Sequence, residues 1–301
     1  MKHVRTVLLV TVAMLPTAGL QAQGTPDYSK VTVTTTRLGN TFATLNGQGG
    51  TTGVLFGPDG VLVIDTQFAP LTDKLLAAIR GLTPQPIRYV VNSHVHNDHT
   101  GGNANFAKAG ATIIAREELR ARLANPTAAA GQPAPAVAPE SLPRVTYRDR
   151  LTLYMNGETV QLVAIPRAHT DGDTLVSFPG LDVIMTGDFY RSVQYPNIDR
   201  TNGGTLQGLL DGLGTVIGRA GPATKIIPGH GPTVDRSAVV AHRDLVLVVR
   251  DRVATLLGQG KSEDEVVAAR VTADIDSRVQ ESDTTRERFV RQVYQELKSA
   301  R

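Results

Sequence analysis

The chain has 301 residues, of which 31 are Lys or Arg and 28 are Asp or Glu, so its formal net charge is only +3. This near balance, with no dense basic run, argues against a nucleic-acid-binding surface. The absence of cysteine excludes disulfides and limits the ligands of any metal ion to histidine and carboxylate side chains.

The first 22 residues resemble a secretory signal peptide. Lys2 and Arg5 precede a short apolar run at 7–15, and Ala22 supplies a small residue at the expected cleavage point. The apolar run is shorter than the roughly 20 residues that a membrane anchor needs. We therefore expect a periplasmic or secreted protein with no stable membrane anchor after cleavage. Without Lys2 and Arg5, 29 basic residues face 28 acidic ones, which leaves a charge of +1.

Residues 23–301 have the length of a single large domain and alternate between strand-like and helix-like patterns. Runs of β-branched and apolar residues predict strands at 31–36, 61–64, 87–91, 111–114 and 225–227, and in short runs across 145–190. Apolar residues at helical spacing predict helices at 72–79, 116–124 and 206–217. We therefore expect an α/β fold in which a sheet-on-sheet core is covered by helices.

The ends of several helices also carry signals in the sequence. Gly81 is the expected C-cap of the helix at 72–79. Beyond residue 227 the chain is expected to be helical, and residues from about 260 to 301 form a helical C-terminal extension of the same domain. Ser262-x-x-Glu265 and Thr284-x-x-Glu287 both match capping boxes, so a helix is predicted to begin after each.

Histidine is scarce, and five of the seven residues fall in three short motifs. These are His94-Val95-His96-Asn97-Asp98-His99, Ala168-His169-Thr170-Asp171-Gly172-Asp173 and Pro228-Gly229-His230-Gly231-Pro232. His94 and His96 point to one side of an extended backbone, and Asp98 and His99 add a second pair if the chain turns. Because a zinc ion takes about four ligands, this run can serve two metal ions. Further ligands are then needed, and the candidates are His169, Asp188 and His230.

These motifs, in this order, resemble those of the metallo-β-lactamase fold superfamily over residues 30–240. Residues 190–204 are similar, more loosely, to exported hydrolases of the SoxH-like group. The resemblance implies an αββα four-layer sandwich that holds two Zn²⁺ ions at one edge. Asp65, after the strand at 61–64, matches the family's first acidic motif and is expected to support the ligand loop. The implied ligands are His94, His96 and His169 for the first ion, Asp98, His99 and His230 for the second, and Asp188 as a bridge.

Two zinc ions that share a hydroxide predict a hydrolase of small molecules. We expect attack of the metal-bound hydroxide on an ester, lactone, thioester or amide bond. Asp98 is the candidate catalytic residue, because its carboxylate can position the nucleophile and pass a proton to the leaving group. The best-studied β-lactamase subclass has a cysteine at the position of Asp188, which instead resembles the glyoxalase-, lactonase- and general hydrolase-type members.

Two alternatives stay open at this point. One is a periplasmic β-lactamase that acts on β-lactam antibiotics. The other is a non-catalytic zinc-binding protein or a di-iron redox protein. The sequence determines neither the substrate nor the oligomeric state, and sites of histidine and carboxylate accept zinc, iron or manganese.

Three further residues have competing interpretations. Tyr190 and Tyr195 closely follow Asp188, so either could lie at the rim of the site and donate to an oxyanion. Packing of an aromatic ring over this loop is the favoured interpretation. His242 lies on a predicted helix without a nearby acidic motif, and we expect a packed or surface histidine there.

The motif around His169 and one long loop are also open to two interpretations. Asp171 and Asp173 flank His169, where they either orient its ring or form a turn. Residues 125–143 are rich in alanine and proline and form either a flap over the substrate or an ordinary surface loop.

Overall fold

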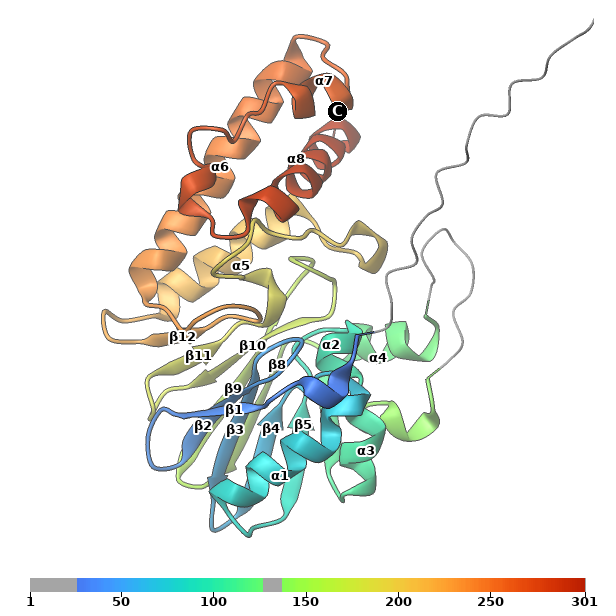
Figure 1. Ribbon diagram of the computed structural model, residues 1–301, viewed down its shortest axis with the longest axis vertical. Coiled ribbons are helices and arrows are strands. Elements are labelled where there is room, and N and C mark those ends of the chain that lie inside the picture. Colours follow the sequence, from blue (N-terminus) through green and yellow to red (C-terminus); the bar gives the residue numbers. More distant parts are fainter. Residues whose placement is uncertain (1–25, 127–136, 301) are drawn as a thin grey trace, which may run out of the picture.

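The computed structural model describes residues 26–126 and 137–300 (Figure 1). The predicted signal peptide and most of the proposed flap therefore lie outside the described residues. Two β-sheets pack face to face, and helices cover the outer face of each sheet, as Figure 1 shows. The predicted α/β fold, an αββα four-layer sandwich, is confirmed.

The first sheet has seven strands in chain order, antiparallel from β1 to β4 and parallel from β4 to β7. The antiparallel strands follow one another through short loops, whereas the parallel strands need the crossovers that carry α1 to α4. The strands are β1 (Thr34–Arg37), β2 (Phe42–Asn46), β3 (Thr52–Gly57), β4 (Gly60–Ile64), β5 (Ile87–Val91), β6 (Thr112–Arg116) and β7 (Val145–Tyr147).

The second sheet has five strands in the order β12-β11-β10-β9-β8. Only β11 and β12 are parallel neighbours in it. Asn156 and Gly157, both at positive φ, form the two-residue turn between β8 and β9. The strands are β8 (Arg150–Met155), β9 (Glu158–Ile165), β10 (Asp173–Phe178), β11 (Val183–Met185) and β12 (Lys225–Ile227).

Three apolar layers hold the sandwich together. The layer between the sheets joins side chains such as Leu62 and Val91 of the first sheet to Leu162 and Val176 of the second. Because successive side chains of a strand alternate between faces, β4 also contributes Val63 to the layer under α1 and α3. The third layer lies between the second sheet and the C-terminal helices. Both faces of the central strands are therefore buried, which explains their continuous apolar runs.

The helices divide between the two outer faces. Those of the first half, α1 (Thr72–Leu82), α2 (Asn97–Thr100), α3 (Asn103–Lys108) and α4 (Glu117–Ala124), lie by the first sheet. Those of the second half lie over the other sheet and extend away from it in Figure 1. They are α5 (Leu206–Arg219), α6 (Arg236–Gly258), α7 (Glu263–Ala268) and α8 (Ser282–Ser299).

Two of the predicted helix ends are wrong. Helix α1 continues to Leu82, so Gly81 lies inside it and Thr83 is the C-cap. The capping box at Ser262 and Glu265 is confirmed, but Thr284 lies within α8, whose first residue is Ser282. The Thr284 hydroxyl instead donates to the carbonyl oxygen of Glu281, a bond that the sequence pattern does not distinguish from a cap.

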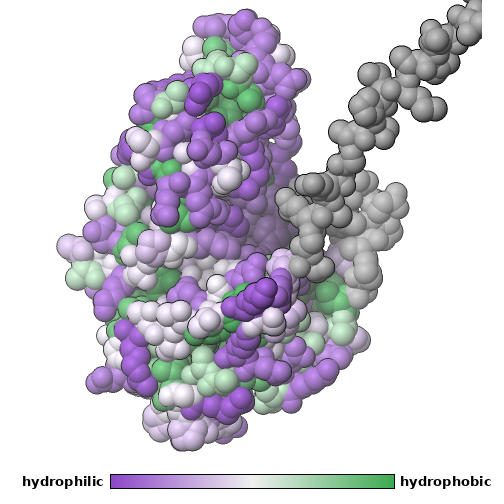
Figure 2. Space-filling model, in the orientation of Figure 1, coloured by the Kyte–Doolittle hydropathy of each residue, from purple (hydrophilic) through white to green (hydrophobic). Residues whose placement is uncertain are grey.

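Within the described part of the chain, no helix combines the length and the apolarity needed to cross a bilayer. The face drawn in Figure 2 is largely hydrophilic over the C-terminal helices, and its apolar residues are scattered rather than gathered in one patch.

Candidate metal centre

The ligand candidates come from loops at one edge of the sandwich. His94, His96, Asp98 and His99 follow β5, and His169 lies in the connection from β9 to β10. Asp188 and His230 follow β11 and β12, whose parallel pairing brings their carboxyl ends side by side. Because these strand ends share an edge of the fold, ligands far apart in sequence meet there. All seven predicted ligands fall into two groups of four that share Asp188.

The first group consists of His94, His96, His169 and Asp188, whose ligand atoms lie within 4.8 Å of one another. Nδ1 of His96 is 3.2 Å from Nε2 of His94 and 2.9 Å from Nε2 of His169. Oδ2 of Asp188 is 3.7 Å from Nε2 of His94 and 3.8 Å from Nε2 of His169. Three imidazole nitrogens and one carboxylate oxygen therefore converge, which is the number of ligands that a tetrahedral zinc ion takes.

The second group consists of Asp98, His99, His230 and Asp188, again within 4.8 Å. Nε2 of His230 is 3.1 Å from Oδ2 of Asp98 and 3.3 Å from Oδ1 of Asp188. Nε2 of His99 is 3.2 Å from the same Oδ1 and 3.6 Å from Oδ2 of Asp98. The two oxygens of Asp188 thus face different groups, as a carboxylate that bridges two cations must.

Unpaired buried atoms test whether these residues fit metal ions. Nε2 of His99, Nε2 of His230 and Oδ1 of Asp188 are all buried and have no hydrogen-bond partner. Buried polar atoms are normally hydrogen-bonded, because an unpaired one loses its hydration without compensation. These three atoms belong to one group and face one another, so a cation between them would satisfy all three. The residues therefore fit a metal centre.

Electrostatics also favour cations at this edge. Burial lowers the pKa of His94 and of His169, the latter to about 3, which leaves both rings neutral with a free electron pair. Burial acts in the same direction on His99, but the charges of Asp188 and Asp65 outweigh it and raise the pKa of that ring. Protons on the histidine rings of the second group thus balance the negative charge of its carboxylates, as a bound metal ion would.

Asp65 lies behind this group and contacts the ligand loop. Its Oδ1 accepts from the backbone N–H of Ser93 at 2.7 Å, and its Oδ2 accepts from the Ser93 hydroxyl at 2.6 Å. Oδ2 is also 2.7 Å from Nδ1 of His99. A proton on Nδ1 leaves Nε2 of His99 free to bind a metal ion. The structure places Asp65 as the sequence analysis expects.

Two glycines allow the chain to pass close to the ligands. A Cβ atom on Gly229 would overlap Oδ1 of Asp188, and one on Gly50 would overlap the ring of His99. The Gly-His-Gly motif therefore has a steric reason as well as a ligand. Gly50 is a residue that the sequence analysis did not identify.

The sequence analysis also missed the partners that orient the first group. Oδ2 of Asp199 lies 2.7 Å from Nε2 of His96, so this carboxylate holds the ring with Nδ1 toward the metal site. The carbonyl oxygen of Asn197 accepts from Nδ1 of His169 at 2.6 Å. Both partners lie in the segment 190–206, and helix α8 holds that segment through the Gln292 side chain, which bonds to Asn197 and to the N–H of Ile198.

Tyr190, Tyr195 and His242, whose roles had competing interpretations, all have structural roles. Tyr195 is fully buried, stacks on Phe289 and donates to Asp276. Tyr190 is buried with its ring perpendicular to that of His242. Both tyrosines are therefore packed in the core rather than at the rim, and His242 lies outside the two ligand groups.

The two aspartates beside His169 stabilise the turn that carries it. Asp173 accepts from the backbone N–H groups of His169 and Thr170, at 2.6 and 2.9 Å. Asp171 pairs with Arg122 at 2.7 Å. Neither carboxylate bonds to the His169 ring, so the turn-forming interpretation holds for both.

Comparison with known families supports the same centre. A family model described as "Metallo-beta-lactamase superfamily" matches residues 45–230. This range includes all seven candidate ligands, and it ends on His230 itself. The looser likeness to the SoxH-like group stays a prediction.

Two characterised relatives match part of the chain. The alpha subunit of 2,4-dinitroanisole O-demethylase from Nocardioides sp. is 29% identical over 145 residues, which cover 46% of this chain and 42% of the relative. The linear primary-alkylsulfatase of Pseudomonas sp. is 24% identical over 257 residues, which cover 70% of this chain and 48% of the relative. The chain thus spans about half the length of the curated relatives that it matches.

Solved structures share the fold at lower identity. An inverting sec-alkylsulfatase from Pseudomonas sp. superimposes with a TM-score of 0.67 at 18% identity, over 87% of this chain and 50% of the other. A metallo-beta-lactamase from Pontibacter korlensis superimposes with a TM-score of 0.60 at 20% identity, over 71% of this chain and 99% of the other. At these identities the likeness concerns the fold alone.

Proposed function

The chain belongs to the metallo-beta-lactamase superfamily, and on that premise we propose that it is a hydrolase that uses two zinc ions. The observation that carries this proposal is the position of Asp188. Its two oxygens face two separate ligand groups, and its Oδ1 is buried and unpaired together with Nε2 of His99 and Nε2 of His230. Two metal sites held side by side in this way are typical of phosphatases, nucleases and aminopeptidases, which are hydrolases.

When bound, the metal ions would supply Lewis-acid polarisation of the scissile group and a water molecule of lowered pKa. The residues around them would set the geometry. Asp65 and Asp199 fix the rings of His99 and His96, so that Nε2 of His99 and Nδ1 of His96 face the metal site. This orientation would let the site form without rearrangement.

Asp98 is the candidate to move protons. Its side chain is 21% exposed, whereas that of Asp188 is fully buried, so Asp98 is the ligand carboxylate that a substrate can reach. Although burial opposes ionisation, the nearby imidazole rings of His230 and His99 lower the pKa of Asp98 to about 2. The carboxylate is therefore ionised at neutral pH, ready to accept a proton from the attacking water and to release it to the leaving group.

We propose a small molecule with an ester-type bond as the substrate, including esters, lactones, thioesters and amides. Sulfate esters join this group, because a curated relative and a structural neighbour are alkylsulfatases. The sequence also supports export, which makes the periplasm or the exterior the proposed place of action. Cleavage of β-lactams is the second candidate, favoured by the fold of the structural neighbours that are metallo-beta-lactamases.

The test combines metal analysis with a substrate panel. The purified chain should hold two equivalents of zinc and cleave at least one member of a panel of nitrophenyl esters, lactones, thioesters, sulfate esters and nitrocefin. Prior treatment with a chelator should abolish that cleavage. Asp188→Ala should lose metal and turnover together, whereas Asp211→Asn, an exposed change on α5, should keep both.

Two results would contradict the proposal. Two equivalents of zinc with no turnover of any compound would favour a binding protein. Two equivalents of iron with redox activity would replace hydrolysis by electron transfer.

A further inference from the structure

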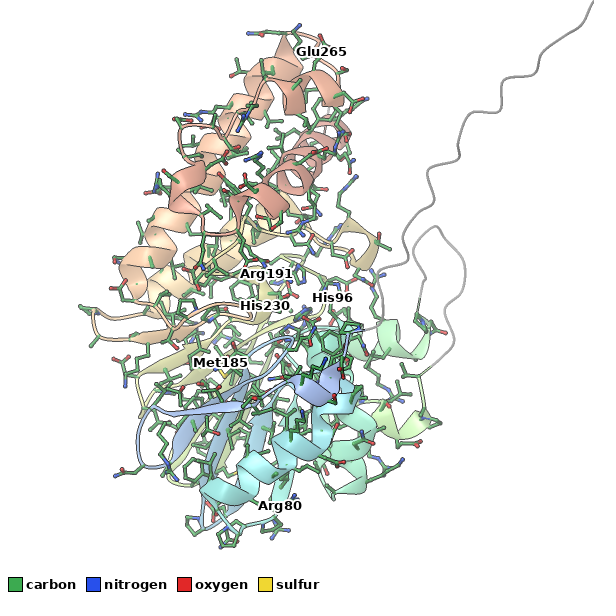
Figure 3. All side chains as sticks on the ribbon, in the orientation of Figure 1. Arg80, His96, Met185, Arg191, His230 and Glu265 are labelled. Atoms are coloured by element: carbon green, nitrogen blue, oxygen red, sulfur yellow. The ribbon has the colours of Figure 1, made fainter. Side chains whose placement is uncertain are left out.

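Arg191 lies against the metal centre. It follows Asp188 by three residues, and its backbone pairs with that of His230 as a short parallel bridge. Its Nη2 donates to Oδ2 of Asp188, and its Nη1 donates to Oε1 of Gln194 at 2.6 Å. Figure 3 shows Arg191 beside His230 and near His96, between the sandwich and the C-terminal helices.

A second arginine, Arg288, reaches this region from helix α8. Thr285 and Gln292 lie one turn before and one turn after it on the same helix face. The Thr285 hydroxyl accepts from the N–H of Tyr195, and Oε1 of Gln292 accepts from the N–H of Ile198. The face of α8 that carries Arg288 is therefore packed against the segment that follows Asp188.

The two guanidinium groups have donors without acceptors. Nε of Arg191, and both Nε and Nη2 of Arg288, are buried and make no hydrogen bond. Among the described residues the Arg288 side chain has neither a hydrogen bond nor an ion pair. Both residues are partly buried as a whole, but these three donor atoms are shielded from water, and a donor that loses its hydration normally gains an acceptor. The missing acceptor is thus expected from outside the described chain.

The charges around Arg288 also indicate that an anion is missing. Burial and the positive charge of Arg191 lower the pKa of Arg288, while Asp188 is the carboxylate that raises it. Yet both oxygens of Asp188 face the metal-ligand groups described above. Once that carboxylate binds cations, neither guanidinium group has an anion of its own among the described residues. Positive groups in such proximity repel one another unless an anion lies between them.

We propose that Arg191 and Arg288 bind a negatively charged oxyanion group of the substrate, next to the metal centre. A sulfate, phosphate or carboxylate group fits, because the fork of guanidinium donors matches the spacing of two oxygens on such groups. The proposal rests on the proposed hydrolase function and narrows it: the substrate is an ester that carries an oxyanion, either as the scissile group or elsewhere in the molecule.

Binding of inorganic anions tests the site directly. Titration calorimetry of the metal-loaded full chain with sodium sulfate and with sodium phosphate should show binding, and Arg288→Leu should weaken it at least tenfold. Arg288→Lys should lose less affinity for these anions, because lysine keeps the positive charge but lacks the paired donors of a guanidinium group. Arg291→Gln removes a guanidinium from the same helix, but one that pairs with Glu263, Asp264 and Glu287, and it should bind like the wild type.

Matched substrates then show where the oxyanion lies. The 4-nitrophenyl monoester of succinic acid and its methyl ester share the scissile bond and differ in one carboxylate, while 4-nitrophenyl sulfate and phosphate carry the oxyanion at the scissile group. For the preferred charged compound, Arg288→Leu should raise KM at least tenfold with a smaller change in kcat. KM for the neutral methyl ester should stay within a factor of two.

The outcomes separate this site from the proposed function. Equal sulfate affinity in the wild type and in Arg288→Leu, or equal changes in KM for charged and neutral esters, would overturn the anion site and leave hydrolysis intact. Loss of sulfate binding in Arg288→Leu, with no ester cleaved by the wild type, would establish the site and overturn the hydrolase. Urea unfolding of each variant controls for the fold, and Arg288→Lys carries the test if Arg288→Leu does not fold.

Discussion

Asp199→Asn is expected to weaken the first metal site without removing any ligand. The carboxylate lies 2.7 Å from Nε2 of His96, and the two side chains are only 18% and 26% exposed. A hydrogen bond to a charged group contributes about 1.5–3 kcal/mol. Every 1.4 kcal/mol corresponds to a factor of ten in affinity, so the affinity for one ion should fall by about 10- to 100-fold. Mutations of other residues that hydrogen-bond to metal ligands reduce metal affinity on the same scale.

The assay is competition with a chromophoric chelator, which resolves the two binding steps. In Asp199→Asn one step should weaken and the other should change little, because the second ligand group does not contain His96. Asp171→Asn is a suitable control, as it removes a similarly exposed carboxylate that pairs with Arg122 and does not touch an imidazole. Unchanged affinity in Asp199→Asn, or the same loss in both variants, would refute the positioning role.

Four further results are expected. Asp98→Asn should reduce kcat by at least about 100-fold, the scale of general acid–base catalysis, while the chain still folds; normal turnover would remove Asp98 from the mechanism. Gly229→Ala should cost metal affinity, because the new methyl group overlaps Oδ1 of Asp188, and metal analysis of the purified variant measures it. Chelation should lower the thermal midpoint of the wild type, since ions that bind only the folded state stabilise it by mass action; a midpoint independent of zinc would contradict a resident metal. For His242, burial lowers the pKa to about 4, so its contribution to stability is complete above the unfolded value of 6.5 and is lost as the pH falls toward 4. Between pH 7 and pH 5 the wild type should therefore lose about 2 kcal/mol more than His242→Leu in urea unfolding, and parallel curves would show that folding does not lower the pKa of His242.

The candidate ligands could be predicted because they lie in short motifs at strand ends. His94 to His99 is a dense local signal, and the apolar strands before Asp188 and His230 were visible in the sequence. The layers of the fold followed from the same alternation of strands and helices. These features depend on neighbours within a few residues, which a single sequence displays.

The residues that orient the candidate ligands are instead brought there by contacts between residues that are far apart in sequence. Asp199 lies 103 residues after His96 along the chain, and Gln292 lies 95 residues after Asn197. Arg288 carried no local signal, since an arginine on an amphipathic helix is usually a surface residue. The same limit explains Thr284: its spacing to Glu287 matched a cap, but the preceding residues already formed the helix.

Helix α8 is far in sequence from the histidine motifs, yet it holds the segment that orients His96 and His169. Local unfolding of this helix would release Asn197 and Asp199, and the two rings would lose the partners that fix them. Opening of α8 and loss of the first metal ion should therefore be coupled, although no residue of the helix is itself a candidate ligand.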